Sequence, residues 1–98
     1  MAKILPLQSV AFGSVGAGYG TAATYTDPIS QLTIISTLDQ PALISFNASA
    51  DHLLITAGQE RTIDPDDVGA FLNGVVSVKR DSAAPTVGKI VFEAMSKD

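Results

Sequence analysis

Four glycines fall within nine residues in the stretch GSVGAGYGT, residues 13–21, which follows an apolar segment. Glycine-rich turns after a strand can cradle phosphate groups with their backbone N–H groups. A dinucleotide fingerprint needs the spacing G-x-G-x-x-G, whereas Gly16 and Gly18 are followed at the third position by Thr21. No Gly-Lys-Ser/Thr occurs, and the downstream TAATYTDP does not predict a helix. The spacing therefore argues against a nucleotide site and favours a flexible, adaptable segment.

A group of acidic residues is the second candidate, because carboxylates bind calcium. An EF-hand loop needs oxygen ligands at alternating positions, then a glycine and a terminal glutamate, and only a fragment of this pattern is present. Helix capping explains the same residues, with an aspartate at the N-cap, a proline at the first helical position and carboxylates near the positive helix end. We expect no metal and no cofactor at these residues, which are Glu60, Asp64, Asp66 and Asp67.

His52, the only histidine, lies beside Asp51 and near Ser45 and Ser49, which raises the question of a serine–histidine–aspartate site. Adjacent residues at a strand end point to opposite faces, so Asp51 and His52 are poorly placed to cooperate. The nucleophile motif G-x-S-x-G is absent, and the chain has no cysteine for a thiolate nucleophile or a disulfide. The sequence therefore predicts a non-enzymatic protein without catalytic residues.

Charge is sparse in this chain of 98 residues, of which 46% are hydrophobic and 16% are charged. The net charge is −4 and the basic residues are scattered, which argues against direct nucleic-acid binding. A low charge content also suggests that part of the surface meets a partner. Pro6 and Gln8 interrupt the apolar N-terminus, and no run is long enough for a membrane span. We expect a protein made and used in solution without membrane contact.

Short alternating segments separated by turns dominate from residue 31 onward and predict an all-β fold. We expect a small antiparallel β-sandwich of six to seven strands, either jelly-roll or immunoglobulin-like, with one short helix near residues 65–72. A tight hairpin is predicted at residues 57–59. The apolar faces are expected to point inward at Ala42, Ile44 and Phe46, Val76 and Val78, and Ile90, Phe92 and Ala94. Within residues 31–37, Leu32, Ile34 and Ser36 alternate with Thr33, Ile35 and Thr37. The predicted strands are residues 31–37, 42–47, 52–56, 60–64, 75–80 and 89–95, with a seventh indicated within residues 3–12.

Residues 12–30 differ in composition from the rest of the chain. They are small, polar and rich in glycine, and their apolar residues do not recur with a period of either 2 or 3.6 residues. We therefore expect an extended N-terminal arm over residues 1–30 ahead of a sandwich domain over residues 31–98. Tyrosines among small residues provide contact area and a hydroxyl at low entropic cost. The residues expected to contact a partner are Phe12, Val15, Tyr19 and Tyr25.

Two segments, TIISTLDQPALISFNASADHLLITAGQERTID and VVSVKRDSAAPTVGKIVFEAM, carry a resemblance to a known class of proteins. The pattern begins with a short strand, a turn that contains proline and a second strand, LISFN. A polar turn then leads into a strand that begins Asp-His. An Ala-Gly turn, a Val-rich strand and Pro-Thr-x-Gly before the last strand complete the pattern. About two thirds of the chain thereby resembles the small β-sandwich virion proteins of tailed bacteriophages, of the head-decoration, collar or fibre-associated type.

This resemblance implies a homo-oligomer that binds the major capsid, portal or tail proteins of the same particle. It also implies a location in the virion, after assembly in the cytoplasm of the bacterial host, and it carries no catalytic residues. The alternative reading is a receptor- or glycan-binding module, with a site in the loops NASADH or RDSAAPT.

Overall fold

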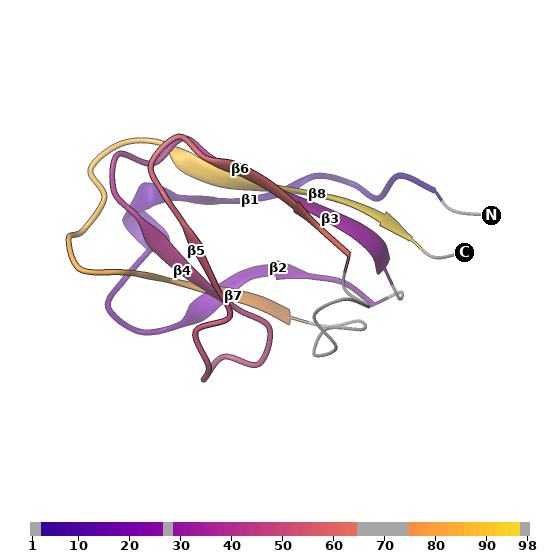
Figure 1. Cartoon of the computed structure of the whole chain (residues 1–98), viewed down its shortest axis with the longest axis horizontal. Coiled ribbons are helices and arrows are strands. Elements are labelled where there is room, and N and C mark those ends of the chain that lie inside the picture. The colour runs from indigo at the N-terminus through magenta and orange to yellow at the C-terminus, as the bar shows by residue number, and fades with distance from the viewer. Residues whose placement is uncertain (1–2, 27–28, 65–74, 97–98) are drawn as a thin grey trace.

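Two four-stranded antiparallel sheets pack against each other in the computed structural model (Figure 1). The structure describes residues 3–26, 29–64 and 75–96. A single 3-10 turn, Phe12–Ser14, follows the first strand of this part of the chain. The predicted all-β sandwich is thus confirmed, with eight described strands rather than six or seven. The strands are β1 Gln8–Ala11, β2 Gly20–Thr24, β3 Ile29–Ser36, β4 Ala42–Ser45, β5 Leu53–Ile55, β6 Glu60–Ile63, β7 Val75–Arg80 and β8 Lys89–Ser96.

The strand order is β1-β8-β3-β6 in one sheet, here called sheet A, and β2-β7-β4-β5 in the other, sheet B. Counted inward from the two ends of the chain, β1 pairs with β8, β2 with β7, β3 with β6 and β4 with β5. This is a long hairpin rolled into two layers, the jelly-roll arrangement. An immunoglobulin domain distributes its strands differently. The topology therefore selects the jelly roll from the two arrangements that the sequence left open.

The core lies between the sheets and is built from alternate residues of the long strands. On β3, Leu32 and Ile34 are buried, and on β8, Ile90, Phe92 and Ala94 are buried. Their inward orientation follows from the two-residue period of a strand, and that of the β8 residues was predicted from the sequence. Removal of apolar area from water between the layers is the main stabilising contribution. The facing strands of sheet B contribute the buried side chains Ala42, Ile44, Ile55, Val76 and Val78.

The N-terminal region does not form an arm ahead of the sandwich. β1 pairs with β8 along Gln8–Ala11, and β2 pairs with β7 along Gly20–Thr24, so this region supplies an edge strand to each sheet. Val10 and Ala23 are buried in the core. A strand within residues 3–12 was predicted, but β2 was not, because small residues and a register shift between Thr21 and Ala23 conceal the alternation that marks a strand. The boundary expected at residue 30 is wrong for the described part of the chain.

The glycine-rich stretch, residues 13–21, connects sheet A to sheet B. It includes the end of the 3-10 turn and the first residues of β2, and the backbone N–H of Arg80 donates to the carbonyl of Gly16 at 2.9 Å. Val15 in its middle is buried. The stretch is folded against its own domain, so the expectation of an adaptable segment within an extended N-terminal arm is wrong.

The tight turn at residues 56–59 also differs from expectation. Gly58 has φ of 72°, and the N–H of Gln59 donates to the carbonyl of Thr56 at 3.1 Å, as in a hairpin turn. However, β5 pairs with β4 in sheet B whereas β6 pairs with β3 in sheet A, so the turn joins the two layers. Turn residues and alternation indicate where a strand ends but not which strand becomes its neighbour. The helix predicted near residues 65–72 lies outside the described residues.

Candidate functional site

The four residues predicted to contact a partner occupy two different environments. Val15 and Tyr25 are each 4% exposed and belong to the core. Phe12 is 41% exposed at the end of β1, and Tyr19 is half-buried before β2. A buried side chain has no surface to offer while the fold is intact, so in this fold only Phe12 and Tyr19 of the four are accessible. These four residues therefore do not form one contact surface.

Tyr19 belongs to a polar cluster that joins the glycine-rich stretch to a distant loop. Its hydroxyl donates a hydrogen bond to Asp51 Oδ1, and Lys79 Nζ lies 3.4 Å from the same oxygen. The Lys79 ammonium also lies 4.6 Å from the centre of the Tyr19 ring, a cation–π contact. The three side chains come from three segments, so their mutual contacts hold these segments together.

The cluster is not arranged for proton transfer. Burial raises the pKa of Tyr19 to about 12, and the hydrogen bond to Asp51 acts in the same direction. That hydrogen bond in turn lowers the pKa of Asp51 below its usual range, with a further contribution from Lys79. At neutral pH the tyrosine is protonated, the aspartate is ionised and the ammonium is positive. Each group is thus held in its ordinary state, and the cluster is a structural one.

His52 is also committed to the fold. Its Nδ1 accepts a hydrogen bond from the backbone N–H of Phe46 at 3.0 Å, and its ring stacks on the Phe46 ring at 5.5 Å. Asp51 bonds to Tyr19 and Lys79, while Ser45 Oγ donates to Asn47. The serine, the histidine and the aspartate considered for catalysis therefore each have a different partner, and the structure does not assemble them.

The loop 46–52, which contains the sequence NASADH, is ordered by one amide side chain. Asn47 Oδ1 accepts hydrogen bonds from the backbone N–H groups of Ser49 at 3.0 Å and Ala50 at 2.9 Å. Ala48 has φ of 62°, which a turn of this kind imposes on a residue other than glycine. The loop proposed for ligand binding is therefore built largely from its own hydrogen bonds.

The loop 81–88, which contains most of RDSAAPT, is fastened by Asp39. The Asp39 carboxylate accepts hydrogen bonds from the backbone N–H of Thr86 at 2.8 Å and from its hydroxyl at 2.5 Å. These bonds lower the pKa of Asp39 below its usual range, since they stabilise the ionised form. Pro85 beside them is buried. The Pro-Thr-x-Gly pattern noted in the sequence thus marks a loop anchor.

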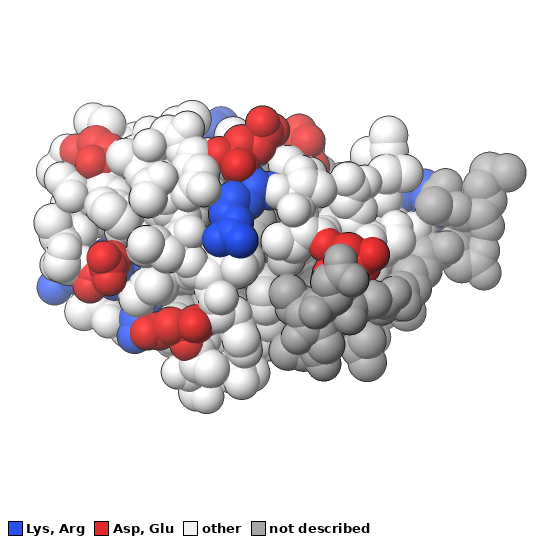
Figure 2. All heavy atoms as spheres, viewed as in Figure 1, with Lys and Arg blue, Asp and Glu red and all other residues white. Residues whose placement is uncertain are grey.

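Glu60 and Asp64 are the described members of the acidic group, and Asp66 and Asp67 lie outside the described residues. Within the described ranges, no group of three or more histidine, cysteine or acidic residues is placed to hold a metal ion. The same ranges contain no helix long and apolar enough to cross a membrane. The face in Figure 2 is mostly uncharged, and its acidic and basic groups are scattered rather than gathered in one patch.

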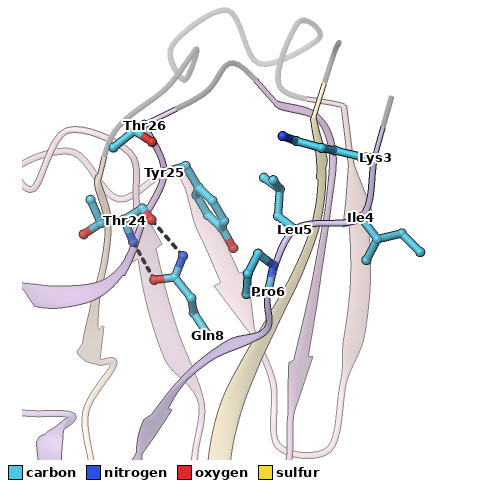
Figure 3. Close-up of a pocket in the computed structure, with 8 residues that line it drawn as sticks. All are labelled: Lys3, Ile4, Leu5, Pro6, Gln8, Thr24, Tyr25 and Thr26. Atoms are coloured by element: carbon cyan, nitrogen blue, oxygen red, sulfur yellow. Dashed lines mark hydrogen bonds between the residues drawn. The ribbon is translucent and has the colours of Figure 1, made fainter. Parts of the chain in front are cut away.

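One hollow lies between the N-terminal segment and the end of β2 (Figure 3). Its volume is about 600 Å³, and the Tyr25 ring lies between the two segments. Gln8 joins the sheets beside it: its side-chain amide donates to the Thr24 carbonyl at 2.7 Å and accepts from the Thr24 N–H at 2.9 Å. Burial raises the pKa of Tyr25 to about 12. The lining offers one ammonium, on Lys3, and no paired acid and base.

A second hollow of about 420 Å³ lies on the outer face of sheet A. Ile4 and Leu7 at its border are 81% and 64% exposed. Figure 3 shows Ile4 directed away from the Tyr25 ring, whereas Leu5 lies on the side of the ring. Sequence reasoning missed these exposed residues. Alternation in Ile4-Leu5-Pro6-Leu7 places Ile4 on the face opposite Leu5 and so offers a signal for Ile4, but it places Leu7 on the same face as Leu5 and offers none for Leu7. The hollow is lined by Ile4, Leu7, Gln31, Thr33, Glu93, Ala94 and Met95.

A scan against known protein families and a search of curated proteins return no match. Among solved structures, the fold is similar to that of a subunit from Bacillus endospore appendages, which are described as a family of disulfide-linked pili. The identity is 10%, the alignment covers 98% of this chain and 86% of that chain, and the TM-score is 0.58. At this identity the likeness establishes the fold. It gives no support to the phage virion class that the sequence resembles.

Proposed function

We propose that the protein is a non-enzymatic structural subunit that assembles with further copies of itself. The observation that carries this proposal is the pair of large apolar side chains, Ile4 and Leu7, standing exposed beside one hollow of the sandwich. Single exposed apolar residues are ordinary, but neighbouring ones beside a concave surface are typical of a contact site. The low charged fraction of 16% points the same way.

The fold is compatible with this role. The similar solved structure belongs to pili, which are assemblies of many subunits. Those pili are described as disulfide-linked, whereas this chain contains no cysteine. Assembly of the present protein would therefore depend on non-covalent surface contacts.

A non-enzymatic role is supported by the state of the reactive side chains. Tyr19, Asp51 and Lys79 bond to one another, and His52 bonds to the backbone. Catalytic groups, in contrast, commonly have shifted pKa values that suit proton transfer near neutral pH. Here the shifts on Tyr19 and Asp51 keep each group in its ordinary protonation state.

The finer proposal places the assembly in a tailed-phage virion, with capsid, portal or tail proteins as partners and formation in the host cytoplasm. It is supported by the sequence resemblance over residues 31–96 and by the occurrence of jelly rolls among viral capsid proteins. Mass spectrometry of purified particles from a lysate that contains this chain tests it, and absence of the chain from the particles would overturn it.

Jelly rolls also occur among lectins, which keeps a glycan-binding role as the second candidate. Its site would lie in the exposed loops 46–52 and 81–88. A glycan array with the purified protein tests this role, and specific binding that is lost on exchange of loop 46–52 would favour it over assembly.

The assembly proposal is tested by light scattering of the purified full chain across a wide concentration range, followed by electron microscopy of the concentrated sample. We expect oligomers that increase with concentration. A strictly monomeric protein at every concentration would overturn the proposal.

A further inference from the structure

The outer face of sheet A, which belongs to the upper layer in Figure 1, carries a short apolar stripe at its middle, formed on its two central strands between Ser9 of β1 and Glu60 of β6. Val91 on β8 pairs with Ile35 on β3, and both are only half-buried although they point away from the core. Met95 lies further along β8 on the same side, next to the exposed Ile4. Solvent-facing positions of a sandwich are usually polar, so we expect another protein surface to pack on this stripe.

Two charges on β8 stand symmetrically about this stripe. Lys89 lies two residues before Val91 and Glu93 lies two residues after it, and all three share the outer face. Four residues of strand separate the two charges by about 13 Å, too far for an ion pair with each other. Within the described part of the chain, neither side chain forms an ion pair.

Exposed apolar residues extend this symmetry to the ends of the sheet. Met95 lies four residues after Val91, and the exposed Val87 lies four residues before it. At one end of β8, Met95 lies beside Ile4 and Leu7. At the other end, Val87 precedes Gly88, and the Gly88 carbonyl accepts a hydrogen bond from the N–H of Phe12. Four of the six large apolar side chains exposed among the described residues thus belong to the segments at the two ends of sheet A: Ile4, Leu7, Phe12 and Val87.

We propose that two copies of the chain pack the outer faces of sheet A together, around a twofold axis that crosses the strands at Val91 and Ile35. The axis reverses the strand direction, so Lys89 meets Glu93 of the second copy and Glu93 meets Lys89 of the second copy. The hollow bordered by Ile4 and Leu7 receives Val87 of the second copy. This is a self-complementary surface, in which residue i contacts residue j and j contacts i.

The proposal commits to a second copy because one surface supplies both signs of charge and both apolar ends. This inference rests on the proposed assembly function and specifies its contact surface. Two strands of eight residues, β3 and β8, and two of four residues, β1 and β6, spaced about 4.8 Å apart, present roughly 400 Å² of sheet, less than the ~800 Å² per partner of a standard interface. The dimer should therefore dissociate on dilution. Glu60 pairs with Ile35 and so lies on the same row as the axis, which would bring it opposite Glu60 of the second copy at the rim. Solvent screens this like-charge contact.

Charge reversal tests the geometry. Lys89→Glu or Glu93→Lys alone places two like-charge contacts in the symmetric interface, and dimerisation should weaken by roughly tenfold or more. The double variant K89E/E93K restores opposite charges and should dimerise like the original protein. An equimolar mixture of the two single variants should form mixed dimers, because each contact then joins opposite charges. Asp81→Lys, on a loop away from this face, is the control for a change of net charge.

Sedimentation velocity of the full-length variants gives the dissociation constants, and circular dichroism verifies that each variant is folded. Recovery in both the double variant and the mixture supports the twofold packing. If oligomers form with the same dissociation constant in all these variants, this interface is wrong, but the proposed assembly function is not contradicted. A protein that is monomeric throughout would overturn both.

Discussion

Gly88 is the residue at which two loops come into closest contact. Its φ of 93° lies in the left-handed region, and a Cβ at this position would stand 2.1 Å from the carbonyl oxygen of Thr37. The close approach lets the N–H of Thr37 donate to the Lys89 carbonyl at 2.8 Å. Both the backbone conformation and the space therefore require glycine here.

Gly88→Ala should consequently lower the free energy of unfolding by about 2 kcal/mol or more, because the strained φ and the backbone clash add. Gly58→Ala is the matched control: Gly58 also has a positive φ of 72°, but an added Cβ there meets nothing within 4 Å. We expect that control to cost only about 1 kcal/mol. Urea unfolding of both variants measures the difference, and equal losses would contradict the steric argument.

Asp39 makes the fold sensitive to acid. Its folded-state pKa lies below the ordinary value of 3.8, mainly because of the Thr86 hydrogen bonds. The associated stability is therefore fully present above that value and is lost as pH falls through the lower folded-state pKa. Below about pH 4, the thermal unfolding midpoint should fall less steeply with decreasing pH in Asp39→Asn than in the original protein. An identical slope in both would rule out this contribution, and Asp81→Asn serves as a surface control.

At the scale of elements, Gln8 on β1 is the link between the edge strands of the two sheets. Its side chain forms two hydrogen bonds with the backbone of Thr24 on β2. Gln8→Ala should expose the Thr24 N–H to water and accelerate its hydrogen exchange, with a loss of stability of about 1 kcal/mol. Gln8→Glu keeps the acceptor and should retain protection of that amide. Amide exchange followed by NMR distinguishes the two, and unchanged exchange in both would contradict the link.

The inclusion of β1 and β2 in the sheets also changes how assembly should be tested. Removal of residues 1–30 would take an edge strand from each sheet, together with the buried Val10 and Ala23. Failure of such a truncated chain to assemble would report unfolding rather than a lost contact. Surface substitutions that leave the core intact are therefore the informative experiment.

At the scale of the whole molecule, the exposed apolar residues are expected to affect assembly but not the stability of the fold. The double variant Ile4→Ser and Leu7→Ser should leave the unfolding midpoint nearly unchanged, since both side chains are largely exposed. The same variant should shift the equilibrium toward monomers, because the apolar contact is lost. Light scattering and thermal unfolding give the two readouts. The matched control is Leu54→Ser, an exposed apolar residue of β5 in the other sheet, and equal effects of both variants on assembly would contradict the assignment.

The sequence by itself determined that the chain is an all-β protein, where six of its strands lie and which side chains of β4, β7 and β8 face the core. These features are local, because the two-residue period of a strand is written in its own alternation of apolar and polar residues. The absence of cysteine likewise settled that no disulfide forms.

Only the tertiary structure decided that β2 exists, that β5 and β6 belong to different sheets, and that Val15 and Tyr25 are core residues rather than contacts. The physical reason is that pairing depends on residues distant in the chain. A glycine- and alanine-rich segment such as β2 has no apolar period of its own and becomes a strand because β7 supplies its hydrogen bonds. The outer face of sheet A, with Lys89 and Glu93 on either side of Val91, likewise arises only once β1, β3, β6 and β8 lie side by side.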